Sequence, residues 1–81
     1  MKIANILVID DDKMVCDMLC RFIESMGHTA SYVVTLHEGV QKIFSEDYDL
    51  VFLDVRLPDG NGLEAIPKIK KAPSYYKGLF Y

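Results

Sequence analysis

The chain lacks the features that mark several classes of protein. Its 81 residues include only two cysteines, Cys16 and Cys20, with no second cysteine pair and no nearby histidine. A disulfide or thiolate metal site is therefore not expected, and both cysteines fit as small helix residues in a reducing compartment. The apolar stretch after Met1 and Lys2 ends at Ile9, too short for a signal peptide or a membrane span. We expect one small cytoplasmic domain with no membrane partner.

Positive charge is scarce over most of the chain. Residues 1–67 hold five Lys/Arg against twelve Asp/Glu, whereas residues 68–81 add four lysines and no acid. The net charge of −3 thus divides into an acidic body and a basic end. Because an acidic surface repels the phosphate backbone, direct binding of nucleic acid is not expected.

Apolar runs alternate with amphipathic stretches along most of the sequence. Strands are expected at about residues 4–10, 29–34 and 50–54, and helices at about 13–26 and 35–45 and from about residue 62. The connections are long enough for parallel pairing, so the pattern predicts an α/β fold. The second strand is the most polar of the three, which is typical of a sheet edge.

Helix boundaries have recognisable signals. Thr35 and Glu38 have the spacing of a capping box, Gly27 ends the first helix, and Asn61 can cap the third. Pro67 lies beyond the first turn of the third helix and should kink or shorten it. The first helix carries an apolar stripe at Met14, Val15, Met18, Leu19, Phe22, Ile23 and Met26.

Acidic residues follow two of the expected strands. Asp10, Asp11 and Asp12 follow the first, and Asp54 follows the third. Both strands consist of wholly apolar runs, Ile6–Ile9 and Leu50–Leu53, so each is expected to be buried on both faces of the sheet. If these strands are parallel neighbours, their carboxyl ends bring the carboxylates into one crevice. Like charges at close range repel, so such a cluster holds a cation or keeps a proton, and an oxygen-only site suits Mg²⁺. Aspartates after strands also cap helices, which is the alternative interpretation of each one.

Two segments, Val8–Asp12 and Leu53–Gly62, resemble the receiver domain of two-component response regulators. The resemblance covers roughly residues 3–72, and Pro58 and Gly62 match the loop that follows the acceptor in that family. It implies a flavodoxin-like parallel sheet in which the first strand lies between the second and the third, the order 2-1-3. Only three strand–helix units are recognisable, so the fold implied is a partial receiver.

The resemblance implies a role for individual residues. Asp54 matches the phospho-acceptor, Asp10 and Asp11 match the acidic pair that holds Mg²⁺, and Arg56 matches the residue whose backbone carbonyl completes the metal shell. Asp12 matches no essential position and is expected to start the first helix. The implied function is a phosphorelay receiver, not a turnover enzyme, which takes a phosphoryl group from a sensor histidine kinase or a phosphotransfer protein onto Asp54.

The resemblance stops before the chain does. A complete receiver continues to a fourth strand that ends in Thr or Ser and a fifth that ends in Lys, and neither is recognisable here. We therefore expect an incomplete or altered receiver at residues 1–72 and an aromatic tail at residues 73–81, which serves as an extra strand or an association segment. Association of copies is expected through this tail or the edge of the third strand. The alternative is a truncated fragment with a loose end.

Two other functions remain open at this point. Half a receiver fold could serve as a non-phosphorylated interaction or oligomerisation module, with metal optional. A small Mg²⁺-dependent phosphohydrolase with an aspartate nucleophile is the third, and the spacing of Asp10 and Asp12 fits it only loosely. Labelling by a phosphodonor favours the receiver, and sustained turnover of a phosphate ester favours the hydrolase.

Overall fold

The computed structural model describes residues 2–70 and shows alternating strands and helices. The elements in chain order are β1 (Asn5–Ile9), α1 (Lys13–Ser25), β2 (Thr29–Val33), α2 (Leu36–Ser45), β3 (Leu50–Leu53), β4 (Arg56–Leu57), β5 (Gly60–Asn61) and α3 (Gly62–Ile69). The expected strands and helices are all present, with bounds close to those predicted. The tail predicted at residues 73–81 lies outside the described residues.

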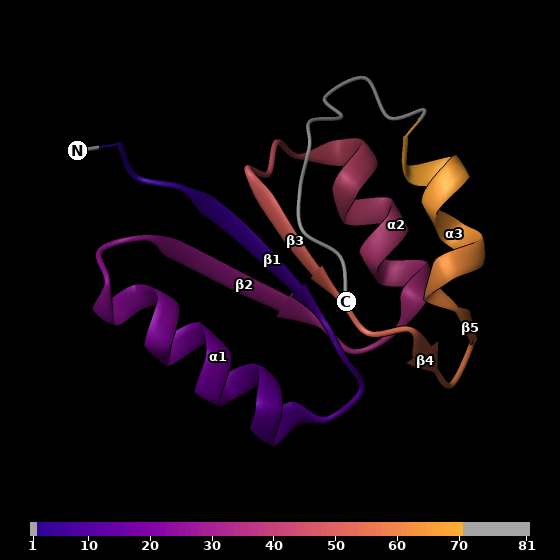
Figure 1. Cartoon of the computed structure of the whole chain (residues 1–81), viewed down its shortest axis with the longest axis horizontal. Helices are drawn as coiled ribbons and strands as arrows, with labels where there is room; N and C mark the ends of the chain where they lie inside the picture. Colours follow the sequence, from indigo (N-terminus) through magenta and orange to yellow (C-terminus); the bar gives the residue numbers. More distant parts are fainter. Residues whose placement is uncertain (1, 71–81) are drawn as a thin grey trace.

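The three long strands form one parallel sheet in the order β2-β1-β3, which confirms the predicted topology (Figure 1). The register places Ile9 opposite Val33 on one side and opposite Leu53 on the other. Two further backbone bonds extend the sheet past its last paired residues: Asp10 N donates to Val33 O at 3.2 Å, and Asp54 N donates to Ile9 O at 2.9 Å. The acids that follow β1 and β3 therefore leave the sheet side by side.

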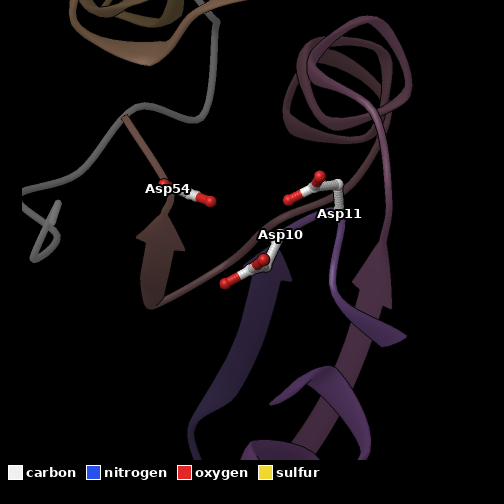
Figure 2. A group of neighbouring side chains, drawn as sticks. All are labelled: Asp10, Asp11 and Asp54. Atoms are coloured by element: carbon white, nitrogen blue, oxygen red, sulfur yellow. The ribbon is translucent and has the colours of Figure 1, made fainter. Parts of the chain in front are cut away.

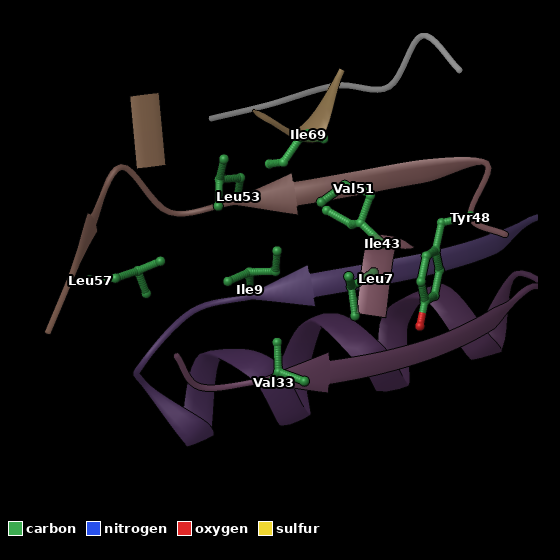
Figure 3. Packing of buried hydrophobic residues seen from close by; sticks show 9 residues of the cluster. All are labelled: Leu7, Ile9, Val33, Ile43, Tyr48, Val51, Leu53, Leu57 and Ile69. Atoms are coloured by element: carbon green, nitrogen blue, oxygen red, sulfur yellow. The ribbon is translucent and has the colours of Figure 1, made fainter. Parts of the chain in front are cut away.

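Helices cover both faces of the sheet, α1 on one side and α2 and α3 on the other (Figure 1). Side chains of β1 alternate between the two cores. The core beneath α2 and α3 holds Leu7, Ile9, Val33, Ile43, Tyr48, Val51, Leu53, Leu57 and Ile69 (Figure 3). The core beneath α1 holds Ile6, Val8, Cys16, Cys20 and Ile23.

Burial differs between the strands in the way a central strand and two edges require. In β1, Ile6 to Ile9 are all buried, as predicted for a strand covered on both faces. In β2 only Val33 is buried, which confirms its expected place at an edge. In β3, Val51 and Leu53 are buried but Leu50 and Phe52 are half-buried, so the prediction of full burial on both faces is wrong for this strand. Within residues 2–70, α1 is the helix that covers that face, and it packs mainly over β1 and β2.

The apolar stripe of α1 is only partly turned toward the sheet. Met14, Met18 and Phe22 are exposed, whereas Cys16 and Cys20 are buried against the sheet. The small thiols let the helix lie close to β1, and this rotates the bulkier side chains outward. Burial, with a smaller effect of the Asp10 charge, raises the pKa of Cys16 to about 11. A thiol with so high a pKa is unreactive near neutral pH, in agreement with a packing role.

The helix boundaries follow the predicted signals. Thr35 Oγ1 accepts a bond from Glu38 N at 3.2 Å and donates to Glu38 Oε1 at 3.0 Å, and Asn61 Oδ1 accepts from Leu63 N at 2.8 Å. Gly27 follows α1 with a φ of +88°, a conformation that glycine adopts without strain. Pro67 lies inside α3, which ends two residues later at Ile69.

One feature of the loop after Asp54 was not predicted. Arg56 and Leu57 pair with Asn61 and Gly60 as a short antiparallel hairpin, β4–β5, whose turn is formed by Pro58 and Asp59. Leu57 is buried in the core beneath α2 and α3, so the hairpin is attached to the body of the domain. Within residues 2–70, no helix is long and apolar enough to cross a membrane.

Gly39 fixes how closely α2 approaches β1. A Cβ at this buried position would lie 2.5 Å from Cδ1 and 2.9 Å from Cγ1 of Ile9. Replacement by alanine favours the helix by about 1 kcal/mol, but the overlap with Ile9 forces α2 or the core to shift. We expect Gly39→Ala to lower the free energy of unfolding in urea by about 1–2 kcal/mol, and exposed Gln41→Ala in the same helix to change it by less than about 0.5 kcal/mol. Equal stabilities would contradict this close packing.

Candidate functional site

The sheet delivers three carboxylates to one place. Asp10 and Asp54 are the first residues after the paired Ile9 and Leu53, and their backbone N–H groups are held by the neighbouring strands. Asp11 follows Asp10 where the chain turns toward α1. One carboxylate oxygen from each of Asp10, Asp11 and Asp54 can be chosen so that all three lie within 4.8 Å of one another. Figure 2 shows these side chains converging above the ends of the strands.

The donor set suits a hard divalent cation. All three groups offer carboxylate oxygen, with Asp10 and Asp54 half-buried and Asp11 exposed to solvent. Ions such as Mg²⁺ bind one or two carboxylates and retain several waters, which an open site of this kind permits. Within residues 2–70, this is the one group of three or more potential ligands placed so closely. The residues predicted from the two strand ends are therefore brought together.

The electrostatics of the site also favour a cation. Burial raises the pKa of Asp10, and the negative charges of Asp54, Asp11 and Asp12 add to that effect. A hydrogen bond that Asp12 N donates to Asp10 Oδ1 at 3.0 Å acts in the opposite direction and stabilises the ionised form. A bound cation would remove the repulsion that these carboxylates exert on one another.

Asp12 has a different role from its two neighbours. Its Oδ1 accepts bonds from Met14 N at 3.0 Å and from Val15 N at 3.4 Å, which makes it the N-cap of α1. This confirms the expectation that Asp12 starts the helix. The alternative in which every acid after a strand is a cap is correct for Asp12, whereas Asp10, Asp11 and Asp54 face one another.

A local hydrogen bond orients the Asp54 carboxylate. Arg56 N donates to Asp54 Oδ1 at 3.1 Å, so the loop that follows the acid orients its side chain. The side chain of Arg56 is exposed, and its backbone lies in β4 beside Asn61. The use of the Arg56 carbonyl as a metal ligand stays a prediction.

Gly62 closes the loop tightly against Asp54. Gly62 N donates to Val55 O at 2.8 Å, and a Cβ at this position would lie 2.5 Å from the backbone oxygen of Asp54 and 3.1 Å from Cγ of Leu53. Backbone oxygen cannot move aside as the end of a side chain can. This close contact with the Asp54 backbone explains why the receiver-like loop has a glycine at position 62.

Two contacts near the site were missed in the sequence. The carboxylate of Asp59 accepts bonds from Leu36 N at 2.8 Å and His37 N at 2.9 Å, the first two residues of α2. The thiol of Cys16 donates to Asp10 O at 3.2 Å. The motif marked Asp59 only as part of a loop, because its partners are 22 and 23 residues away. His28 and His37 lie outside the carboxylate cluster.

Comparisons with known proteins agree on one family. The family model of the response regulator receiver domain matches residues 6–80. The swarming motility regulation protein RssB of Serratia marcescens is 37% identical over 62 residues, and these are 76% of this chain and 28% of that protein. The chain thus spans less than a third of the length of this relative.

Solved structures give the same result. A receiver domain (CheY-like) from Methanospirillum hungatei JF-1 is 30% identical with a TM-score of 0.89, over 98% of this chain and 63% of that one. A response regulator from Burkholderia pseudomallei is 23% identical with a TM-score of 0.86, over 95% of this chain and 45% of that one. The second structure holds a phosphorylated aspartic acid, a calcium ion and citrate, and its likeness to this chain shows the fold alone.

The close approach of Gly62 to Asp54 is testable by a single methyl group. In Gly62→Ala the new Cβ overlaps the Asp54 carbonyl, so the loop and the start of α3 must move apart. We expect urea unfolding to show a loss of about 1–3 kcal/mol. Lys68→Ala, at an exposed site in the same helix, should change stability by less than about 0.5 kcal/mol. An alanine variant as stable as the original chain would show that the loop tolerates a side chain here.

Proposed function

This chain belongs to the response regulator receiver domain family of two-component systems, and on that premise we propose that it accepts a phosphoryl group on Asp54. The observation that carries the proposal is the convergence of Asp10, Asp11 and Asp54 within 4.8 Å at the ends of two paired strands. A strand-end carboxylate with two acidic neighbours suits attack on phosphorus once its negative charge is compensated. The proposed donor is the phosphohistidine of a sensor kinase or of a phosphotransfer protein.

The proposed reaction is a single displacement at phosphorus. A carboxylate oxygen of Asp54 forms a bond to phosphorus while the bond between phosphorus and the donor imidazole nitrogen breaks, and the electron pair of that bond stays with the imidazole. The product is an acyl phosphate on Asp54. The bond from Arg56 N holds the carboxylate in a fixed orientation, which reduces the rotational freedom that is lost in the reaction.

The residues present fit Mg²⁺ as the cofactor. We assign Asp10, Asp11, Asp54 and the backbone carbonyl of Arg56 as the groups that hold it, because the three side chains supply only oxygen and carry mutually repelling charges. Bound there, Mg²⁺ would offset the repulsion between the carboxylates and the incoming phosphoryl group. The calcium ion and phosphorylated aspartic acid in the Burkholderia pseudomallei protein, which has the same fold, are consistent with this assignment.

The proposal describes a signalling acceptor and not a turnover enzyme, and it assigns the chain to the cytoplasm. The expected self-association belongs to the same proposal. β3 is an edge of the sheet within residues 2–70, and its first residue, Leu50, is half-buried and apolar. A second copy that paired there would cover this surface.

The acceptor assignment predicts the behaviour of two matched variants. Asp54→Asn removes the nucleophilic carboxylate with little change in shape, so incubation with acetyl phosphate and Mg²⁺ should give no phosphorylated product by intact mass spectrometry. Asp12→Asn removes a nearby acid but keeps a side chain that caps α1, and it should be labelled as the original chain is. Removal of Mg²⁺ by EDTA should suppress labelling of both the original chain and Asp12→Asn.

Three outcomes would contradict the assignment. Equal labelling of Asp54→Asn excludes Asp54 as the acceptor. A folded original chain that is never labelled favours the non-phosphorylated interaction module. If Asp12→Asn folds but is not labelled, Asp12 takes part in the reaction, and this would favour the hydrolase hypothesis, in which Asp10 and Asp12 act as a pair.

Self-association is checked separately from phosphorylation. Size-exclusion chromatography with light scattering should give a mass above that of one chain, rising with protein concentration. Replacement of Leu50 by lysine places a charge beside the edge of β3 and should reduce this mass. A monomer at all concentrations would contradict the predicted association and leave the acceptor assignment unaffected.

A further inference from the structure

Asp59 makes a contact that links two parts of the domain. It lies at the turn of the β4–β5 hairpin, and its two carboxylate oxygens accept separate bonds from Leu36 N and His37 N. These are the first two N–H groups of α2, whereas the side chain of the N-cap Thr35 accepts the bond from Glu38 N. The two bonds lower the pKa of Asp59, as expected for a carboxylate at a helix N-terminus.

The hairpin carries this contact to the Asp54 carboxylate. Asp59 is in the turn that joins β4 to β5, and Arg56 at the start of β4 donates its N–H to Asp54 Oδ1. Gly60, the next residue, fits against Leu36, because a Cβ there would lie 2.8 Å from Leu36 Cδ2. Any movement of the hairpin away from α2 would therefore move Arg56 relative to Asp54.

The other end of the contact leads to Asp10. α2 begins shortly after β2, and the last residue of β2, Val33, accepts the bond from Asp10 N. The bonds of Asp59 thus complete a ring of connected segments. It runs from Asp10 through β2 to α2, and from α2 through the hairpin and Arg56 to Asp54. Both halves of the carboxylate cluster are held by this ring.

Leu57 holds β4 in the core, whereas Asp59 is the residue of the turn that is hydrogen-bonded to α2. Asp59 is exposed, and a cavity of about 280 Å³ lies beside it, lined also by Leu36, His37, Val40, Ala65 and Lys68 among others. The turn could move into this space if its two bonds were lost.

We propose that Asp59 is a positioning residue for the acidic site, which holds the β4–β5 hairpin against α2 and so fixes Arg56 beside Asp54. The inference rests on the proposed function, because the affected property is the spacing of the groups assigned to Mg²⁺. It differs from a simple helix-capping role, which would affect the stability of α2 but not the site.

Two variants of the same helix start separate these roles. Asp59→Ala removes both bonds to Leu36 N and His37 N, whereas Thr35→Ala removes the ordinary cap and leaves the hairpin contact intact. Each should destabilise the chain by a similar amount in urea, as the loss of a cap does. Mg²⁺ affinity is measured for both variants by NMR titration of the ¹⁵N-labelled chain, and the same spectra report whether each variant is folded.

We expect Asp59→Ala to weaken Mg²⁺ binding by about tenfold, the usual effect of removing a group that supports metal ligands, and Thr35→Ala to leave it unchanged. Asp59→Asn keeps one acceptor oxygen and should restore part of the affinity. Hydrogen exchange of the Arg56 amide should be faster in Asp59→Ala and unaltered in Thr35→Ala, because only the first variant removes the bonds between the hairpin and α2.

The outcomes distinguish this inference from the function on which it rests. If the original chain binds Mg²⁺ and is labelled, but both alanine variants retain its Mg²⁺ affinity and Arg56 exchange, Asp59 is only a cap and the inference is wrong. Equal weakening in both variants also contradicts it, since the effect would then follow α2 stability. If the original chain binds no Mg²⁺ and is never labelled, the proposed function fails first and the inference with it.

Discussion

The parallel register of β1 and β3 is the constraint on which the site depends. Ile9 lies opposite Leu53, so the residues that follow, Asp10 and Asp54, leave the sheet at the same level. A shift of one residue would turn the buried side chains of β3 to the other face. The packing of Val51 and Leu53 beneath α2 and α3 excludes that shift, and the same apolar contacts that stabilise the core therefore place the two carboxylates together.

Five aspartates lie around this end of the sheet, and their charges are compensated in two ways. Asp12 and Asp59 accept hydrogen bonds from the first N–H groups of α1 and α2, where the helix dipole favours a negative charge. Asp10, Asp11 and Asp54 cap none of the helices within residues 2–70, and their carboxylates face one another. The division leaves three carboxylates whose mutual repulsion a bound cation would relieve.

Much of this arrangement was predictable because it depends on local patterns. The apolar runs, the capping pair Thr35 and Glu38, and the acids at the strand ends each act within a few residues or follow from parallel pairing. The contacts that were missed depend on tertiary packing. Nothing near Asp59 in the sequence indicates that it reaches α2, and the rotation of α1 follows from the small size of Cys16 and Cys20 against β1, which a count of apolar residues does not register.

The loop after Asp54 is the place where sequence motif and tertiary structure meet. Gly62 is required because the backbone oxygen of Asp54 occupies the space of a Cβ, and this contact brings the start of α3 to the end of β3. Two contacts hold the hairpin between them: Leu57 is buried in the core, and Asp59 accepts a hydrogen bond from the start of α2. A loop fixed at both ends keeps the Arg56 amide at hydrogen-bond distance from Asp54, so the orientation of the acid is a property of the whole α2–α3 face and not of one turn.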